Sequence, residues 1–151
     1  MTDSATVHAS AVLVGARAVL IQGAAGSGKS RLALDLIDAA ACGLLPFARL
    51  IGDDRVHLSA AHGRLLVRPA ARLAGLLEVR GLGIRRVPYE ELAVVGLVME
   101  LGASDAERLP AAAARITEIA GITIPRLSAA PGTVPLGMVI AALRTGDVPD
   151  V

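Results

Sequence analysis

The sequence is poor in cysteine and in aromatic residues: its 151 residues include one cysteine, one phenylalanine, one tyrosine and no tryptophan. The single cysteine, Cys42, excludes an internal disulfide bond and agrees with a reducing compartment. Because Phe47 and Tyr89 are the only residues of the Phe, Tyr and Trp type, the hydrophobic core has to be aliphatic. The scarcity of rings also argues against a nucleic-acid-binding module that stacks bases on aromatic side chains.

The sequence also lacks a hydrophobic run of the roughly 20 residues that span a bilayer. Arg17 interrupts the first candidate run, and Glu100 interrupts the run that begins at Leu92. Residues 1–4 lack the basic start and apolar core of a signal peptide. The formal net charge of +1 gives the molecule no strong field toward DNA or a membrane. We therefore expect a cytoplasmic protein that uses neither a nucleic acid nor a membrane as partner.

What the sequence does have is a glycine-rich stretch that fits the P-loop pattern G-x-x-x-x-G-K-[ST]. An apolar strand over residues 18–21 precedes it and a helix over residues 29–41 follows, which is the context that the motif requires. Its glycines let backbone N–H groups turn toward phosphate oxygens, and the helix adds the positive end of its dipole. The pattern predicts a nucleotide-binding loop made of Gly23, Ala24, Ala25, Gly26, Ser27, Gly28, Lys29 and Ser30.

Within this loop, Lys29 is expected to reach the β- and γ-phosphates, and the Ser30 hydroxyl is expected to bind Mg²⁺. The alternative is an ordinary glycine turn before a helix. All fixed positions of the pattern are filled, which favours the nucleotide-binding interpretation.

The other apolar segments predict an α/β fold. Two short runs that meet at Gly15 indicate an antiparallel hairpin, and therefore a mixed rather than an all-parallel sheet. Further strands are expected at residues 56–67, as a hairpin, and at 77–80, 92–101 and 121–125. Residues 111–120 are helix-forming or ambiguous, and a closing helix is expected at about 134–143. The length and the 54% of hydrophobic residues predict one domain over residues 1–151.

Asp53 and Asp54 form the next informative feature, at one end of a strand that we predict over residues 53–56. Phosphoryl transfer to a hydroxyl needs an acceptor for the hydroxyl proton and acidic groups that fix the metal. Two adjacent carboxylates can divide these tasks. The alternative is a solvated turn with an ion pair to Arg55, since exposed acidic pairs are common.

Glu78 and Arg80 alternate in a strand-like run that ends in the glycine turn at residues 81–83. Glu78 could ligate Mg²⁺ and Arg80 could bind phosphate, or both could lie in water on an edge strand.

His8 and Arg108 are weaker candidates. From chemistry alone, a lone histidine near a strand start and an arginine in a polar loop are more often structural or exposed than catalytic.

Taken together, several segments resemble the bacterial HPr kinase/phosphorylase catalytic domain. The resemblance covers residues from about 6 to about 143, and the Glu-x-Arg-Gly-Leu-Gly-Ile stretch is its most specific element. The matching segments are Val7-His8-Ala9, Gly23 to Ser30, Asp53-Asp54-Arg55-Val56, Leu77 to Ile84, and Ile122-Thr123-Ile124-Pro125.

The resemblance implies a bifunctional enzyme with a P-loop domain, a mixed sheet and a core like that of phosphoenolpyruvate carboxykinase. Such an enzyme uses ATP and Mg²⁺ to phosphorylate a serine of HPr, the phosphocarrier protein of the sugar phosphotransferase system, or of an HPr paralogue. It also removes that phosphate with inorganic phosphate, which gives pyrophosphate. The family usually assembles as a hexamer, so a homo-oligomer is expected. Many members carry a separate N-terminal domain, and this chain is expected to be the catalytic domain alone.

Carried over residue by residue, the resemblance assigns proton transfer to Asp54, with Asp53 in support, and places His8 and Lys29 at catalytic positions. Ser30 and Glu78 are expected to hold Mg²⁺. Arg108 is the nearest match to the catalytic arginine of the family, and we also count Arg80 among the catalytic candidates. The sequence departs from the family at Ala24-Ala25 and at Arg85-Arg86, which puts the balance of the two activities in question more than the core chemistry.

Two other functions fit parts of the sequence. A small-molecule P-loop kinase would normally carry a compact lid rich in arginine, and none is evident. A regulatory module that binds nucleotide without turnover would need Lys29 and would not need Asp54.

Overall fold

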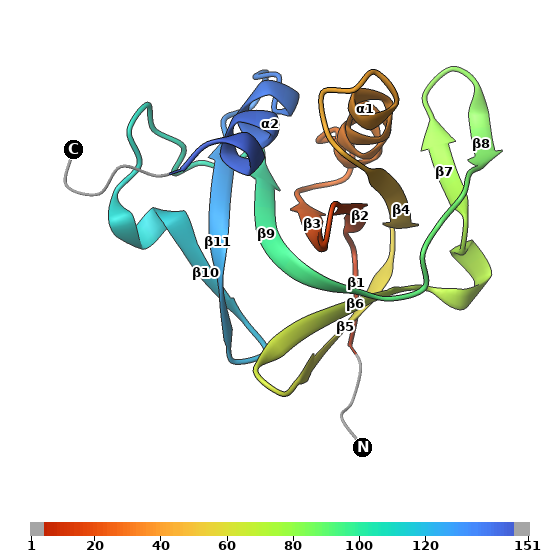
Figure 1. Cartoon of the computed structure of the whole chain (residues 1–151). Coiled ribbons are helices and arrows are strands. Elements are labelled where there is room, and N and C mark those ends of the chain that lie inside the picture. Colours follow the sequence, from red (N-terminus) through yellow and green to blue (C-terminus); the bar gives the residue numbers. More distant parts are fainter. Residues whose placement is uncertain (1–4, 147–151) are drawn as a thin grey trace.

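The computed structural model describes residues 5–146, which form a curled mixed sheet with two helices on one face (Figure 1). The strands are β1 (Ala5–Val7), β2 (Ser10–Val14), β3 (Arg17–Gln22), β4 (Ala48–Gly52), β5 (Val56–Ala61), β6 (Arg64–Pro69), β7 (Leu76–Val79), β8 (Gly83–Arg86), β9 (Ala93–Leu101), β10 (Ile116–Ile119) and β11 (Ile122–Ala129). The helices are α1 (Lys29–Ala41) and α2 (Leu136–Arg144), with short 3₁₀ turns η1 (Ala71–Leu73) and η2 (Ala112–Arg115). None of the helices in this part of the chain is long and apolar enough to cross a bilayer.

Strand direction decides where the ends of the strands meet. β3 is parallel to β9, and β9 is parallel to β11. β2 is antiparallel both to β3 and to β4, so β4 runs in the direction of β3. The carboxyl ends of β3, β4, β9 and β11 therefore lie at one edge of the sheet, and β2 begins there. In open α/β sheets this edge is where ligands bind.

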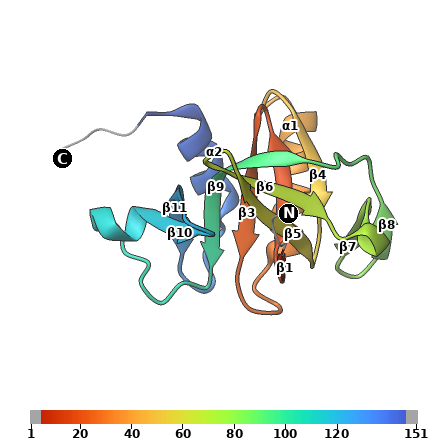
Figure 2. The same ribbon diagram turned by 90° about the horizontal axis from the view of Figure 1, so that it is seen from below.

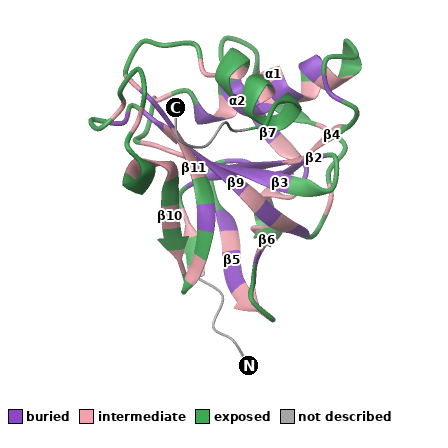
Figure 3. Cartoon of the chain, turned by 60° about the vertical axis from the view of Figure 1, so that its left-hand side comes forward, coloured by how far each residue is buried: buried purple, intermediate pink, exposed green. Residues whose placement is uncertain are grey.

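Two aliphatic clusters hold the sheet between its covering layers. On one face, the cluster joins β3 and β9 to α1 and α2 and includes Leu32, Leu36 and Val139. On the other face, β5 and β6 fold beneath the sheet, and Leu58 and Val67 pack into a second cluster with residues of β3 and β9 (Figure 2). Buried residues accordingly concentrate on β3 and β9 (Figure 3).

Helix α1 shows why the sequence pattern identified its bounds correctly. Its buried residues Leu32, Leu36 and Ala39 recur at intervals of three and four, which places them on one face. Gly43 ends the helix with a left-handed φ of 80°. The N–H of Leu44 donates to the carbonyl of Ala39, and the N–H of Gly43 to that of Ala40, which is the Schellman arrangement.

The hairpins predicted around Gly15 and over residues 56–67, and the buried strand over residues 92–101, are confirmed as β2–β3, β5–β6 and β9. The closing helix is confirmed as α2, which begins two residues later than predicted.

Two predictions need correction. Residues 111–120 form η2 and β10, because pairing with β11 outweighs the helix propensity of the alanines. Asp53 and Asp54 lie in a turn between β4 and β5 and not in a strand.

Candidate active site

The residues singled out in the N-terminal half of the sequence meet at the edge where the strands end. The glycine loop, residues 23–30, follows β3 directly and runs into α1. Asp53 and Asp54 follow β4, and His8 and Ser10 lie where β2 begins. Segments more than 40 residues apart in the sequence are in this way brought within hydrogen-bonding distance.

Three glycines give the loop a backbone path that other residues rarely adopt. The φ angles of Gly23, Gly26 and Gly28 are 154°, 79° and 101°. A Cβ at Gly23 would lie 2.5 Å from the Oγ of Ser27 and 3.0 Å from the carbonyl oxygen of Leu101. The Oγ of Ser27 is buried and finds no hydrogen-bond partner among residues 5–146. The loop thus combines tight packing underneath with an unsatisfied hydroxyl.

Gly23→Ala is expected to be the most damaging small substitution in the loop. The added methyl meets backbone and Cβ atoms of Leu101, which cannot move as a flexible side-chain end can, so we expect a loss of about 2–3 kcal/mol of stability together with weaker nucleotide binding. Thermal unfolding and titration with a fluorescent ATP analogue would measure both. Gly26→Ala is the matched control, because its φ is also positive but nothing lies within 4 Å of the new methyl. Equal effects of the two substitutions would contradict this explanation.

Lys29 lies in the first turn of α1 with its side chain folded back over the loop. Its Nζ donates to the carbonyls of Gly23 at 2.9 Å and Ala24 at 3.0 Å. The residue is only 7% exposed, and no carboxylate in the described part of the chain forms an ion pair with it. A buried ammonium held only by neutral carbonyls is suited to receive an anion.

Asp53 is the polar centre of the site and is 4% exposed. Its Oδ1 accepts hydrogen bonds from Ser10 Oγ at 2.6 Å and from Ser30 Oγ at 2.8 Å. Its Oδ2 accepts from Ser30 Oγ at 2.9 Å and from the backbone N–H of Glu78 at 3.1 Å. The carboxylate therefore fixes the Ser30 hydroxyl and joins the loop to β2 and to β7.

Asp54 has a different partner from Asp53 and pairs with His8. The distance between Asp54 Oδ1 and His8 Nε2 is 2.6 Å, and the two side chains are 60% and 46% exposed. The backbone of Asp54 has a φ of 69°, and the N–H of Arg55 donates to the carbonyl of Asp53 at 2.8 Å. This is a γ-turn whose central residue is left-handed, a rare and strained conformation of the kind found at functional sites. The turn buries one carboxylate and leaves its neighbour open to a second reactant.

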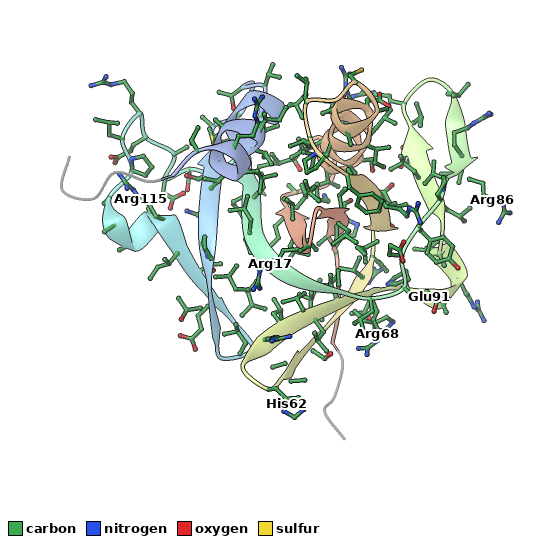
Figure 4. All side chains as sticks on the ribbon, in the orientation of Figure 1. Arg17, His62, Arg68, Arg86, Glu91 and Arg115 are labelled. Carbon is green, nitrogen blue, oxygen red and sulfur yellow. The ribbon has the colours of Figure 1, made fainter. Side chains whose placement is uncertain are left out.

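Glu78 and Arg80 belong to the hairpin β7–β8, which stands apart from the main sheet. The backbone N–H of Glu78 donates a hydrogen bond to Asp53, which holds Glu78 beside the site, and the side chain of Glu78 is exposed. Arg80 lies in the turn of the hairpin and is exposed; its side chain makes no hydrogen bond or ion pair with residues 5–146. In Figure 4 the side chain of Arg86, from β8, points away from the sheet.

Arg108 is exposed in the loop between β9 and η2 and makes no hydrogen bond or ion pair within the described residues. The base of that loop is fixed two strands away from β3, because both Nη atoms of Arg126 on β11 donate to Asp105 at 3.0 Å. The Arg126 guanidinium lowers the pKa of the Asp105 carboxyl. The structure thus brings Asp53, Asp54, His8, Lys29 and Ser30 together, and it gives Arg108 and Arg80 no contact with them.

Two features of the site could not be predicted from the sequence: the role of Ser10, and a cavity beside the glycine loop on its β9–β11 side. Ser10 is fully buried, and the only signal was a polar residue at the start of an apolar strand. The cavity has a volume of about 510 Å³ and lies between the glycine loop, the end of β9 and the loop that follows β11. Its lining residues include Gly26, Gly102, Ala130 and Thr133. Alanines, glycines and prolines in loops carry no chemical signature, so only the fold reveals it.

Within residues 5–146, no three His, Cys, Asp or Glu side chains are arranged to hold a metal ion by themselves. The donor set that does exist is the Ser30 hydroxyl next to the Asp53 carboxylate, and the backbone N–H of Glu78 donates to the same carboxylate. Mg²⁺ commonly takes one or two protein oxygens and completes its shell with phosphate and water. The residues present fit that mode of binding.

Comparison with known proteins gives consistent results. The family model of the HPr serine kinase C-terminal domain matches residues 1–130. The HPr kinase/phosphorylase of Streptococcus thermophilus is 40% identical over 85 residues, which are 56% of this chain and 25% of that protein. The HPr kinase/phosphorylase of Clostridium tetani is 41% identical over 70 residues, 46% of this chain and 21% of that protein. The match thus spans about a quarter of the length of these relatives.

The solved structure of the HPr(Ser) kinase/phosphatase from Coxiella burnetii superposes with a TM-score of 0.73 and 26% sequence identity. The superposition covers 93% of this chain and 94% of that one, so the two chains share the same overall fold. The family model covers far more than half of the sequence and includes the glycine loop, His8, Ser10, Asp53, Asp54 and Glu78. The chain therefore belongs to the HPr serine kinase C-terminal domain family.

Proposed function

We propose that this chain is an HPr(Ser) kinase/phosphorylase domain. It transfers the γ-phosphoryl group of ATP to a seryl hydroxyl of HPr or an HPr paralogue. In the second reaction it transfers the phosphoryl group from that serine to inorganic phosphate, which gives pyrophosphate. The observation that carries the proposal is the division of the acid pair: Asp53 is buried against Ser30 of the glycine loop, whereas Asp54 is exposed and paired with His8. A loop that only binds nucleotide needs the first contact and has no use for the second.

The nucleotide phosphates would lie on the glycine loop. Its backbone N–H groups and the start of α1 attract anions, and Lys29 would exchange its two carbonyl partners for phosphate oxygens. The Ser27 hydroxyl, which lacks a partner, would gain an acceptor. Ser30 and Glu78 would hold Mg²⁺, and bound Mg²⁺ neutralises charge on the transferred phosphoryl group.

In the kinase direction the seryl oxygen attacks the γ-phosphorus, the bond from that phosphorus to the bridging oxygen breaks, and the electron pair leaves with ADP. The seryl proton passes to Asp54, which His8 orients through the 2.6 Å contact. In the reverse direction an oxygen of inorganic phosphate attacks the seryl phosphate. Protonated Asp54 then returns the proton to the departing seryl oxygen, and pyrophosphate forms. One residue serves both directions because a base that has taken a proton is the acid that the reverse step needs.

The cavity beside the loop would take the nucleoside end of ATP. Asp53 and Asp54 lie on the β2–β4 side of β3, and the cavity lies on the β9–β11 side. A nucleotide that crosses the loop therefore places its base in the cavity and its γ-phosphate toward the acid pair. The volume of about 510 Å³ falls within the range of small-molecule sites.

Ala130→Trp is expected to fill this cavity and to raise the dissociation constant for ATP by tenfold or more, about 1.4 kcal/mol, without changing the binding of pyrophosphate. Competition titrations with the two ligands would separate the effects. Ala71→Trp on the exposed η1 turn is the matched control. If Ala130→Trp weakened both ligands equally, the damage would lie in the glycine loop and the assignment of the cavity would fail.

Partner, assembly and location follow the family resemblance. We propose HPr or a paralogue as the protein substrate, a homo-oligomer such as a hexamer as the assembly, and the cytoplasm as the compartment. Light scattering on the purified chain would measure the assembly independently of the activity.

The direct test is incubation with Mg-ATP and HPr, followed by intact-mass analysis for one added phosphate. Inorganic phosphate is then added to the product and pyrophosphate is assayed. Phosphorylated HPr, and pyrophosphate on reversal, would support both directions. Binding of ATP with no change in the mass of HPr would contradict the proposal for that partner, and would favour a regulatory module or a different acceptor.

A further inference from the structure

We propose that Ser10 is a positioning residue that sets the metal-binding and proton-accepting halves of the site relative to each other. The inference rests on the proposed function, because it concerns the nucleotide-bound metal and the acid pair. It starts from the contacts of one side chain. Ser10 is fully buried, and its Oγ donates to Asp53 Oδ1 at 2.6 Å.

The other hydrogen-bond donors of Asp53 are expected to change when the ligand binds, or belong to a less firmly held part of the fold. Of its donors, Ser30 shares one hydroxyl hydrogen between both carboxylate oxygens, at 2.8 and 2.9 Å. That hydroxyl is also the group expected to contact Mg²⁺. The Glu78 N–H belongs to a hairpin outside the main sheet. Ser10, at the start of β2 within the core of the sheet, is the donor whose position does not depend on the ligand.

The same hydroxyl also faces the backbone of the second acid. The N–H of Asp54 lies 3.5 Å from Ser10 Oγ, a long contact that a small shift would shorten. Asp54 is the left-handed centre of the γ-turn, so the orientation of its peptide decides where its carboxylate points. One hydroxyl group therefore touches the side chain of Asp53 and the main chain of Asp54.

His8 strengthens this arrangement because it lies two residues before Ser10, at the approach to the same strand. His8 Nε2 contacts the Asp54 carboxylate at 2.6 Å, and the Ser10 hydroxyl lies 3.5 Å from the backbone nitrogen of Asp54. A shift of β2 at this end would move both contacts together. Ser10 therefore couples the buried carboxylate beside the metal to the exposed carboxylate that takes the proton.

Two effects are expected from Ser10→Ala: the Mg²⁺ concentration that gives half-maximal binding of a fluorescent ATP analogue rises about tenfold, and kcat for phosphoryl transfer falls about tenfold. The KM for the protein substrate changes little, because Ser10 is buried and cannot touch it. Ser10→Thr keeps a hydroxyl and is expected to restore most of both quantities. Ser10→Cys keeps the size but donates a hydrogen bond only weakly, so it is expected to behave like Ser10→Ala.

Ser59→Ala is the matched control, since Ser59 is also a buried serine in a strand, and among residues 5–146 its hydroxyl hydrogen-bonds only with the Arg68 side chain, at 3.5 Å. It is expected to bind Mg²⁺ and nucleotide like the parent chain. Full Mg²⁺ affinity in Ser10→Cys would overturn the proposal, because the hydroxyl would then be dispensable. Equal losses in Ser10→Ala and Ser59→Ala would also overturn it, because they would indicate general destabilisation.

The metal titration does not depend on the identity of the acceptor. If the parent chain fails to phosphorylate HPr, the proposed function fails, and the comparison of Mg²⁺ dependence in the four variants still decides the role of Ser10. Thermal unfolding of each variant shows whether it is folded. If Ser10→Thr unfolds because of its extra methyl, the contrast between Ser10→Cys and Ser59→Ala remains the test.

Discussion

Asp54→Asn is expected to lower the rate of phosphoryl transfer about 10³-fold while leaving the chain folded and able to bind Mg-ATP within about threefold of the parent. The reason is that the amide has nearly the shape of the carboxylate but cannot accept the seryl proton. Asparagine tolerates the left-handed φ of 69° that this position requires, so the γ-turn should persist. The Asn oxygen can also keep the contact that Asp54 Oδ1 makes with His8 Nε2.

Rates would be measured in both directions, as phosphate added to HPr and as pyrophosphate released. Both should fall together, because the same carboxyl group accepts the proton in one direction and donates it in the other. His8→Ala is a graded comparison: it removes the partner that orients Asp54 but leaves the base in place, so we expect a smaller loss of about 10- to 100-fold. If Asp54→Asn kept more than half of the parent rate, the exposed carboxylate of Asp54 would not be the proton acceptor, and a regulatory nucleotide-binding module would be favoured instead.

The parts of the site that depend on neighbouring residues could be predicted from the sequence, and the parts that depend on contacts between distant segments could not. The glycine loop and α1 follow from a pattern of eight adjacent residues and from the 3.6-residue period, so they could be predicted with their bounds. Gly23 and Gly43 matter because of their own backbone angles, and such requirements are visible in the sequence.

The division of labour between Asp53 and Asp54 could not be predicted in the same way. On a strand the two side chains would alternate between faces, whereas at a strand end both could turn toward the phosphates, and the sequence does not decide between these geometries. In the structure a γ-turn separates them, and that turn is defined by a hydrogen bond between Arg55 and Asp53 and by contacts with Ser10 and His8, more than 40 residues earlier. Neither the strained φ nor the long-range partners leave a periodic pattern. The cavity could not be predicted for a related reason, since the loops after β9 and β11 that line it carry small residues with no chemical pattern, such as Gly102, Ala130 and Gly132.

Replacement of Lys29 by methionine is expected to abolish function without harming the fold. Lys29 is the only lysine in the sequence, and its ammonium is buried against two carbonyls with no carboxylate paired to it among residues 5–146. Methionine has a similar length, adapts to irregular packing and removes a buried charge whose desolvation opposes folding. The two carbonyls lose a donor, but they lie on a loop beside a cavity and can bind water. We therefore expect a Tm within about 3 °C of the parent value, or above it.

The loss of function in Lys29→Met should be large because each phosphate contact of the ammonium is a charge-assisted hydrogen bond. Affinity for ATP is expected to fall about 10- to 100-fold and phosphoryl transfer about 10³-fold, since charge on the transferred group is no longer stabilised. Arg64→Met is the control for net charge, because it also removes one positive charge. Arg64 begins β6 at the tip of the β5–β6 hairpin. His62, which is labelled in Figure 4, marks this tip, and it lies at the opposite end of the molecule from α1.

The parent chain offers an independent measurement, because an amine-reactive reagent has one side-chain target. Mg-ATP or pyrophosphate should protect Lys29 from modification, and peptide mapping would read the protection at that single position. Modification of Lys29 at the same rate with and without these ligands would show that the ammonium does not contact phosphate. In that case the loss of activity expected for Lys29→Met would need another cause. Protection of Lys29 in the parent chain, together with an unchanged Tm of Lys29→Met, would place the phosphates on the glycine loop.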